Sequence, residues 1–178
     1  MHSEATTVLL FEDECSLSNT ATVSYSWSKK GKQPIVEQKQ RKRERLTLFG
    51  AVNYGSGQVT VKAAGKGNAH TFKAFLKKVL HVYTQSKVLM VLDNVRYHHA
   101  KALRAFLTKH QHRLELLFLP PYSPQFNPME RVWWYMRKKI THNRAIESMH
   151  IRKQKFWQLF SHFQAPNEQI INLCSTSF

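Results

Sequence analysis

Apolar residues recur along the chain with two spacings, which predict strands first and helices later. Apolar or alternating runs predict strands at Thr7–Phe11, Leu46–Tyr54, Gln58–Lys62, Val88–Leu92 and Leu114–Leu119. Apolar positions three and four residues apart predict helices at His70–Tyr83, at Ala100–His110, from about Pro128, and at Arg144–Phe163. Gly55-Ser56-Gly57 separates the second and third strands, so we expect a hairpin there.

A strand meander followed by alternating helices and strands predicts an α/β fold. We expect a ribonuclease-H-like mixed sheet of five strands flanked by helices, in a single domain over residues 1–178. The basic, poorly apolar stretch Lys29–Arg45 is predicted to be a long loop.

Composition adds a strong positive charge to this picture. The 27 Lys and Arg residues outnumber the 11 Asp and Glu residues, for a formal net charge of +16, which favours a polyanionic partner such as DNA.

No apolar run approaches the roughly 20 residues of a spanning helix, and the N-terminus lacks a signal pattern. We therefore expect a cytoplasmic protein with no membrane partner. Cys15 and Cys174 form no CxxC pair, so neither a disulfide framework nor a thiolate zinc site is indicated.

Three carboxylates are candidates for one site. Asp13 and Asp93 each follow an apolar run, and parallel neighbouring strands would bring both to the carboxyl edge of the sheet. Glu130 begins a helix after the last strand and is the natural third member. Clustered carboxylates repel unless a cation joins them, and hard oxygen ligands suit Mg²⁺ or Mn²⁺. Two such ions support phosphodiester chemistry.

Each of these residues also has a purely structural interpretation. Asn127 fits an N-cap, with Glu130 reaching back in a capping box. Asp93 fits a strand-ending turn, and residues 12–14 fit a solvated acidic tip. A histidine pair such as residues 98–99 is more typical of a surface or a helix start than of a zinc site.

Basic and aromatic residues supply the candidate DNA contacts. Trp133, Trp134 and Tyr135 are consecutive on a predicted helix, so we expect at least one in the core and treat another as a base-stacking or interface candidate. Basic runs are usually solvated faces, but their sum favours DNA binding. The candidates are Lys39, Arg41, Lys42, Arg43, Arg45, Arg131, Arg137 and Lys138.

Two long segments carry a family resemblance. DNVRYHHAK (93–101) and LPPYSPQFNPMERVW (119–133) resemble the catalytic domain of insertion-sequence transposases of the mariner-like DDE superfamily. FEDE (11–14), followed by Trp27, agrees with the first catalytic segment of that family. The resemblance covers about residues 7–173.

The resemblance implies a metal-dependent enzyme with catalytic, metal-binding positions at Asp13, Asp93 and Glu130, with 36 residues between the last two. It implies cleavage of DNA at transposon ends, strand transfer into target DNA, two Mg²⁺ or Mn²⁺ ions and a homodimer on DNA. Asn94 and His98 match the pattern after the second Asp, which implies supporting roles in orienting Asp93 or contacting phosphate. A bacterial, nucleoid-associated protein is expected.

One departure leaves alternatives open. Relatives carry an N-terminal helix-turn-helix region for terminal repeats, and this sequence starts shortly before the first predicted strand. We expect that region to be absent and a separate DNA-binding polypeptide to be a potential partner. The alternatives are a non-catalytic DNA-binding or regulatory remnant and a structure-selective nuclease of the same fold.

Overall fold

A five-stranded sheet forms the centre of the molecule. The structure, a computed structural model, describes residues 6–19, 27–32, 44–121, 123–142 and 148–175. The strands are β1 (Thr7–Ser18), β2 (Arg45–Asn53), β3 (Val59–Ala64), β4 (Lys87–Leu92) and β5 (Leu114–Phe118). The helices are α1 (Ala69–Val82), α2 (Lys101–His110), α3 (Met129–Ile140), α4 (Met149–Ser161) and α5 (Glu168–Ser175), with short 3₁₀ helices η1 (Arg96–His99) and η2 (Pro124–Phe126).

The sheet is mixed and has the order β3-β2-β1-β4-β5. The strands β1, β2 and β3 are antiparallel neighbours, whereas β1 pairs in parallel with β4 and β4 with β5. The predicted hairpin between β2 and β3 and the predicted mixed sheet of five strands are confirmed.

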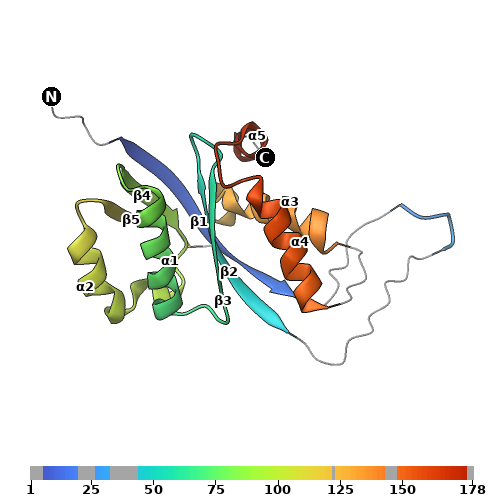
Figure 1. Cartoon of the computed structure of the whole chain (residues 1–178), viewed down its shortest axis with the longest axis horizontal. Coiled ribbons are helices and arrows are strands. Elements are labelled where there is room, and N and C mark those ends of the chain that lie inside the picture. Colours follow the sequence, from blue (N-terminus) through green and yellow to red (C-terminus); the bar gives the residue numbers. More distant parts are fainter. Residues whose placement is uncertain (1–5, 20–26, 33–43, 122, 143–147, 176–178) are drawn as a thin grey trace.

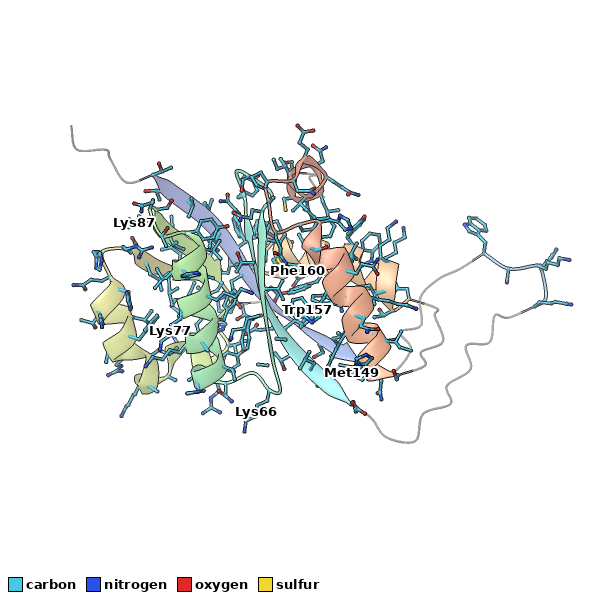
Figure 2. The ribbon with its side chains drawn as sticks, in the orientation of Figure 1. Lys66, Lys77, Lys87, Met149, Trp157 and Phe160 are labelled. Atoms are coloured by element: carbon cyan, nitrogen blue, oxygen red, sulfur yellow. The ribbon has the colours of Figure 1, made fainter. Side chains whose placement is uncertain are left out.

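Helices cover both faces of the sheet, with α1 and α2 on one side and α3, α4 and α5 on the other (Figure 1). Side chains alternate along β1, so Leu10 joins the core under α1 while Cys15 and Leu17 join the core under α3 and α4. Figure 2 shows Phe160 on α4, where it is buried, and Lys77 on α1, where it is exposed.

Helix α1 shows how local sequence sets an element. Asn68 caps its start, because the Asn68 Oδ1 atom accepts from the Thr71 backbone N at 3.0 Å and Thr71 Oγ1 accepts from Asn68 N at 3.1 Å. Apolar residues at helical spacing then face the sheet; the buried set is Phe72, Phe75, Leu76, Val79 and Leu80.

Two predicted boundaries were wrong, and one helix was not predicted. Strand β1 runs to Ser18 rather than ending at Phe11, because its antiparallel pairing with β2 continues where the parallel pairing with β4 stops. The last predicted helix begins at Met149 after the cap Ser148, and residues 144–147 lie outside the described part of the chain. The sequence analysis missed α5, whose eight residues are too few for a clear helical period.

Helix α3 packs closely against the sheet at Gly50, a residue without a side chain. Gly50 is the antiparallel partner of Asp13, and a Cβ atom at Gly50 would overlap the Trp133 ring and the Met129 side chain. Trp133 is 1% exposed, and its Nε1 atom donates to the Asp13 carbonyl at 3.4 Å. The missing side chain at Gly50 therefore lets α3 lie close to β1 at Asp13.

None of the helices within the described residues is both long enough and apolar enough to cross a membrane.

We expect Gly50→Ala to lower the free energy of unfolding by roughly 1–3 kcal/mol, because the added methyl group overpacks the contact with Trp133. Urea denaturation measures this change. Gly65→Ala is the matched control, since no atom lies within 4 Å of a Cβ at Gly65. Equal effects of the two substitutions would contradict the proposed role of Gly50.

Candidate functional site

Two carboxylates meet where β4 ends beside β1. The parallel pairing of these strands stops at Phe11 and Val91, and Asp93 is the first residue after β4. Asp13 lies inside β1 rather than after it, which corrects the prediction that both residues follow their strands. The two still come together, because ligand atoms of Asp13, Glu14 and Asp93 all lie within 4.8 Å of one another.

Glu130 reaches the same cleft from helix α3. A cleft of about 390 Å³ has Asp13, Asp93 and Glu130 among its lining residues. The other lining residues are Asn94, Val95, Leu119, Pro120, Pro121, Ser123 and Asn127. The three predicted carboxylates therefore share one cleft, each supplied by a different part of the fold.

Asn127 fixes the start of α3 against β1. Its Nδ2 atom donates to the Glu12 carbonyl at 2.7 Å, and its Oδ1 atom accepts from the Met129 backbone N at 3.1 Å. The helix begins at Met129, and the capping position falls on Pro128 with no side-chain cap bond. The capping-box interpretation of Glu130 is thus not what the structure shows, and the Glu130 side chain lies at the cleft instead.

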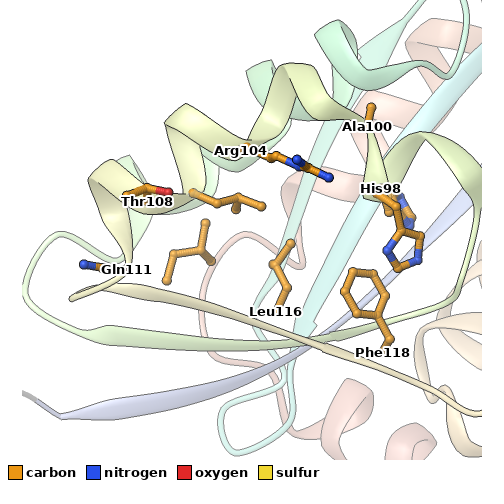
Figure 3. A pocket seen from close by; sticks show the side chains of 10 residues that line it. His98, Ala100, Arg104, Thr108, Gln111, Leu116 and Phe118 are labelled. Carbon is orange, nitrogen blue, oxygen red and sulfur yellow. The ribbon is translucent and has the colours of Figure 1, made fainter.

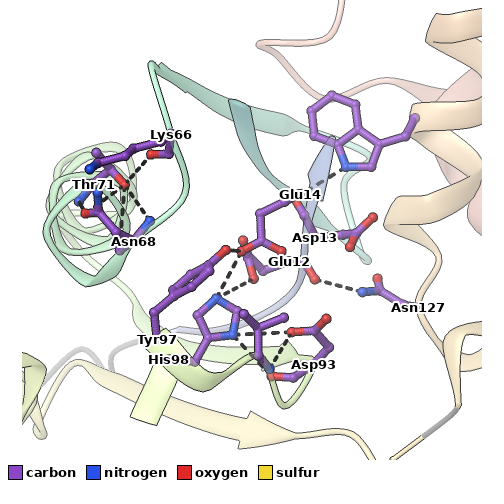
Figure 4. A network of polar contacts seen from close by, with 12 residues as sticks. Glu12, Asp13, Glu14, Lys66, Asn68, Thr71, Asp93, Tyr97, His98 and Asn127 are labelled. Atoms are coloured by element: carbon purple, nitrogen blue, oxygen red, sulfur yellow. Dashed lines mark hydrogen bonds and ion pairs between the residues drawn. The ribbon is translucent and has the colours of Figure 1, made fainter. Parts of the chain in front are cut away.

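A second acidic group lies on the other face of β1 (Figure 4). Glu12 is 1% exposed, and within the described residues both of its carboxylate oxygens lack a hydrogen-bond partner. The solvated-tip interpretation was therefore wrong for Glu12. Glu14 accepts a hydrogen bond from the Tyr97 hydroxyl. Alternation along a strand was the available signal, since it places residues 12 and 14 opposite residue 13.

His98 joins this group to Asp93. Its Nδ1 atom lies 3.3 Å from Asp93 Oδ1, and its Nε2 atom lies 3.2 Å from Glu14 Oε1 and 3.9 Å from Glu12 Oε2. The ring is buried, with its centre 4.2 Å from that of Phe72. Because both ring nitrogens face carboxylates, His98 holds Asp93 in one orientation.

The pKa values show how crowded the negative charges are. Burial raises the pKa of Asp13 to about 7, and the nearby negative charges, Glu14 first, add to this rise. Burial also raises the pKa of Glu12 well above its usual range. Burial raises the pKa of Glu130, which the Arg137 charge opposes. The site thus holds more negative charge than its own cations balance.

His98 and Asp93 shift in the directions expected of an ion pair. Burial alone would lower the pKa of His98, but its hydrogen bonds to Asp93 and Glu14 outweigh burial and raise the pKa to about 10. The hydrogen bond from His98 lowers the pKa of Asp93. The Val95 backbone N also donates to Asp93 Oδ1, at 3.1 Å.

Among the residues that the structure describes, two sets have the geometry to hold a metal ion. One is Asp13, Glu14 and Asp93, and the other is Glu12, Glu14 and His98; in each set the ligand atoms lie within 4.8 Å of one another. The first set offers only carboxylate oxygens beside the open cleft, which suits Mg²⁺ or Mn²⁺. The second is more buried and includes an imidazole.

Asn94 connects the ends of strands β4 and β5. Its Nδ2 atom donates to the Leu119 carbonyl, and its Oδ1 atom lies 3.2 Å from His99 Nε2. These contacts tie the end of β4 to the end of β5 and to η1, while Asn94 also lines the cleft. Its predicted role in orienting Asp93 or contacting phosphate stays a prediction.

The predicted DNA-binding residues occupy different environments. Lys39, Arg41, Lys42 and Arg43 lie outside the described residues. Arg45 is exposed and donates to Ser16 Oγ at 2.7 Å, and Arg137 and Lys138 are exposed on α3. Arg131 is half-buried, and its guanidinium contacts carbonyls of α5, including that of Cys174 at 3.2 Å.

A larger hollow is lined by His98 and His99 but by none of the carboxylates. It has a volume of about 550 Å³ and lies between α2 and the edge strand β5 (Figure 3). Arg104, Leu107 and Phe118 are among its lining residues, and no carboxylate is. Its size exceeds that of the acidic cleft, but its chemistry does not suggest a reaction site.

Known proteins similar to this chain include two bacterial sequences. The insertion element IS630 uncharacterized 39 kDa protein of Shigella sonnei is 26% identical over 152 residues, covering 85% of this chain and 42% of that protein. The uncharacterized protein y4pE/y4sA of Sinorhizobium fredii is 36% identical over 59 residues, covering 33% of this chain and 40% of that protein. The chain spans about two fifths of the length of the first relative.

Solved structures show the same fold. The Mos1 mariner paired end complex with Mn matches with a TM-score of 0.67 and 16% identity, over 93% of this chain and 51% of that one. The Mos1 paired end complex with Mg matches with a TM-score of 0.64 and 17% identity, over 96% and 56%. This likeness confirms the predicted ribonuclease-H-like fold.

The family model of the DDE superfamily endonucleases (DDE_3) matches residues 8–150, which include all three carboxylates that line the cleft. The resemblance predicted from the motifs is confirmed by this match. Because it covers well over half of the chain, the protein belongs to the family of DDE superfamily endonucleases.

Proposed function

We propose that the chain is the catalytic domain of a transposase that cuts DNA at transposon ends and joins the freed ends to target DNA. The observation that carries the proposal is the convergence of Asp13, Asp93 and Glu130 on one cleft from β1, the end of β4 and α3. The insertion-element relative and the transposase complexes among the similar structures support it.

The residues present fit divalent metal ions. The oxygens of Asp13, Glu14 and Asp93 are close enough together to share a cation, and burial, with the nearby negative charges adding to it, raises the pKa of Asp13, so its charged form is disfavoured without a cation. Asp13 and Asp93 would hold two Mg²⁺ or Mn²⁺ ions, with Glu130 completing the second. When bound, such ions activate an attacking oxygen and stabilise a leaving one.

The reaction consists of two displacements at phosphorus. In the first, a water oxygen bonds to phosphorus and the bond to the 3′ oxygen breaks, so that one water is added and a 3′-hydroxyl is freed. In the second, that hydroxyl oxygen bonds to a target phosphorus and displaces another 3′ oxygen. One phosphodiester replaces another in this step, so no external energy source is required.

The protein's own residues position the reacting groups. Glu130 lies at the cleft wall, where it can orient the attacking oxygen, and His98 holds the Asp93 carboxylate in place. The net charge of +16 favours binding of the DNA backbone. Exposed Arg45, Arg137 and Lys138 are the described candidates for phosphate contacts. We expect a homodimer on paired ends.

The first test is metal-dependent nicking of supercoiled plasmid DNA. We expect nicking with Mn²⁺ or Mg²⁺ that leaves 3′ ends a polymerase can extend. Asp93→Asn and Glu130→Gln should each lower the rate on the order of 100-fold or more. Glu115→Gln is the matched control, because this exposed carboxylate of β5 pairs with Lys87 at the start of β4, the opposite end of that strand from Asp93.

Two outcomes would favour the alternatives. Salt-sensitive DNA binding without nicking under any metal would indicate a DNA-binding remnant, since phosphate contacts alone give such binding. Strong preference for four-way junctions over linear duplex would indicate a structure-selective nuclease.

Asp13→Asn should stabilise the metal-free protein. The folded pKa of Asp13 lies above its ordinary value of 3.8, so its ionisation removes stability as the pH rises from about 4 to about 7. At pH 8 in EDTA we expect a gain of at least about 1 kcal/mol in the variant. Thermal unfolding with and without Mg²⁺ checks this, and Mg²⁺ should stabilise the wild type more than the variant. A destabilised variant would contradict the repulsion that we infer.

His98 should make stability fall in alkaline solution. Its folded pKa of about 10 exceeds its ordinary value of 6.5, so its contribution is full below pH 6.5 and is lost as the pH rises through about 10. Urea denaturation in EDTA should show a decline above pH 7 that His98→Asn removes. His70→Asn, at an exposed position of α1, should keep the decline. An identical pH profile for His98→Asn and the wild type would contradict the ion pair.

A further inference from the structure

Helix α3 carries an exposed row of residues that starts at the cleft. Glu130, Trp134, Arg137 and Lys138 are spaced four, seven and eight residues apart from the first, so they share one side of the helix. All four are exposed, whereas the buried side of α3 consists of Met129, Val132, Trp133, Met136 and Ile140. We call this row the outer face of α3.

Trp134 does not contribute to the core. Its side chain is 50% exposed, while its neighbour Trp133 fills the contact over Gly50. The Lys138 Nζ atom lies 5.0 Å from the Trp134 ring centre. Trp157, the exposed tryptophan of α4, differs because its ring packs edge-on against Phe156 and Phe160 at 5.0 and 5.6 Å.

The chemistry of the outer face selects one kind of ligand. An indole with Lys138 at its ring, and with Arg137 one turn further along the same side of the helix, fits a flat base joined to a negatively charged phosphate, which describes a nucleotide. A duplex hides the faces of its bases inside the stack, so away from a duplex end only an unpaired base can stack on Trp134. An apolar protein partner would have to desolvate Arg137 and Lys138, which is costly.

The distance along α3 sets where that nucleotide lies. Trp134 is four residues from Glu130, and one helical turn rises about 5.4 Å. Neighbouring bases of one strand are about 3.4 Å apart when stacked. Along the helix axis Trp134 therefore lies the length of roughly one or two nucleotide steps from Glu130.

We propose that Trp134 is a stacking site for an unpaired nucleobase next to the phosphodiester held in the cleft, with Arg137 and Lys138 contacting the adjoining phosphate. The position of that phosphodiester rests on the proposed function, whereas the preference for an unpaired base rests on the outer face of α3 itself. The site would favour DNA ends that are frayed or single-stranded over intact duplex.

Binding without catalysis tests the proposal. Fluorescence anisotropy with Ca²⁺ in place of Mg²⁺, which supplies cations to the acidic cleft but has the looser coordination geometry, would compare two labelled probes, a blunt duplex and the same duplex with a three-nucleotide 3′ overhang. We expect Trp134→Ala to weaken binding of the overhang about tenfold and binding of the blunt duplex less than twofold. Trp134→Phe should retain most of the overhang affinity, because it keeps an aromatic face.

Two further measurements separate stacking from general effects. Trp157→Ala, at the exposed tryptophan of α4 (Figure 2), should leave both affinities unchanged. A 2-aminopurine in the overhang should be quenched by the wild type and by Trp134→Phe but not by Trp134→Ala. Thermal unfolding of Trp134→Ala should match the wild type, because the removed side chain is half exposed.

Several outcomes would overturn the proposal. Equal weakening of both probes by Trp134→Ala would assign the residue to duplex contact, and unchanged overhang binding would remove it from the DNA site. A dimer of the free protein that Trp134→Ala dissociates in sedimentation would make the outer face a protein interface. Failure of the wild type to bind either probe would overturn the proposed function as well, whereas the other results leave that function standing.

Discussion

The packing of Trp133 over Gly50 determines where the rest of the site lies. Gly50 is the strand partner of Asp13, and the Trp133 indole donates to the Asp13 carbonyl. One residue earlier on β1, the Glu12 carbonyl accepts from Asn127. Helix α3 is thus fixed to the backbone of the strand that carries the acids, so the position of Glu130 relative to Asp13 depends on backbone contacts rather than on long, mobile side chains.

The second constraint is the alternation of side chains along β1, which divides its acids between two environments. Asp13 lines the open cleft, whereas Glu12 lies buried and Glu14 half-buried beside His98. A buried carboxylate is costly unless it is protonated or faces a cation. The raised pKa of Glu12 favours its protonated form, and the raised pKa of His98 favours a cation facing the carboxylates. Through Asp93, His98 then links the buried charges to the cleft.

The sequence predicts the site residues that lie in clear local motifs, but not those whose role depends on contacts with distant parts of the chain. Asp93 and Glu130 stand in long motifs beside clear elements, and Asp13 follows a clear apolar run, so their meeting at the sheet edge followed from strand order. Alternation along the strand could place Glu12 opposite Asp13, but the burial of Glu12 could not be predicted, because a glutamate inside a strand has the same local sequence whether it faces solvent or a histidine 86 positions away (98 − 12). The role of Gly50 depends on a register and a helix contact that no local pattern contains.

The two constraints together explain why the site suits a cation. Packing and hydrogen bonds hold the backbones that carry the three carboxylates, and His98 holds Asp93 itself, so little ordering of the main chain has to accompany binding. The cost of the charged Asp13 carboxylate, which burial causes first and the neighbouring acids increase, remains until positive charge arrives. The resulting destabilisation has to be offset elsewhere, and the two apolar cores on either side of the sheet are the only extensive source of stability within the described residues. A rigid site with excess negative charge therefore gains more from a divalent ion than a flexible one, whose side chains could move apart.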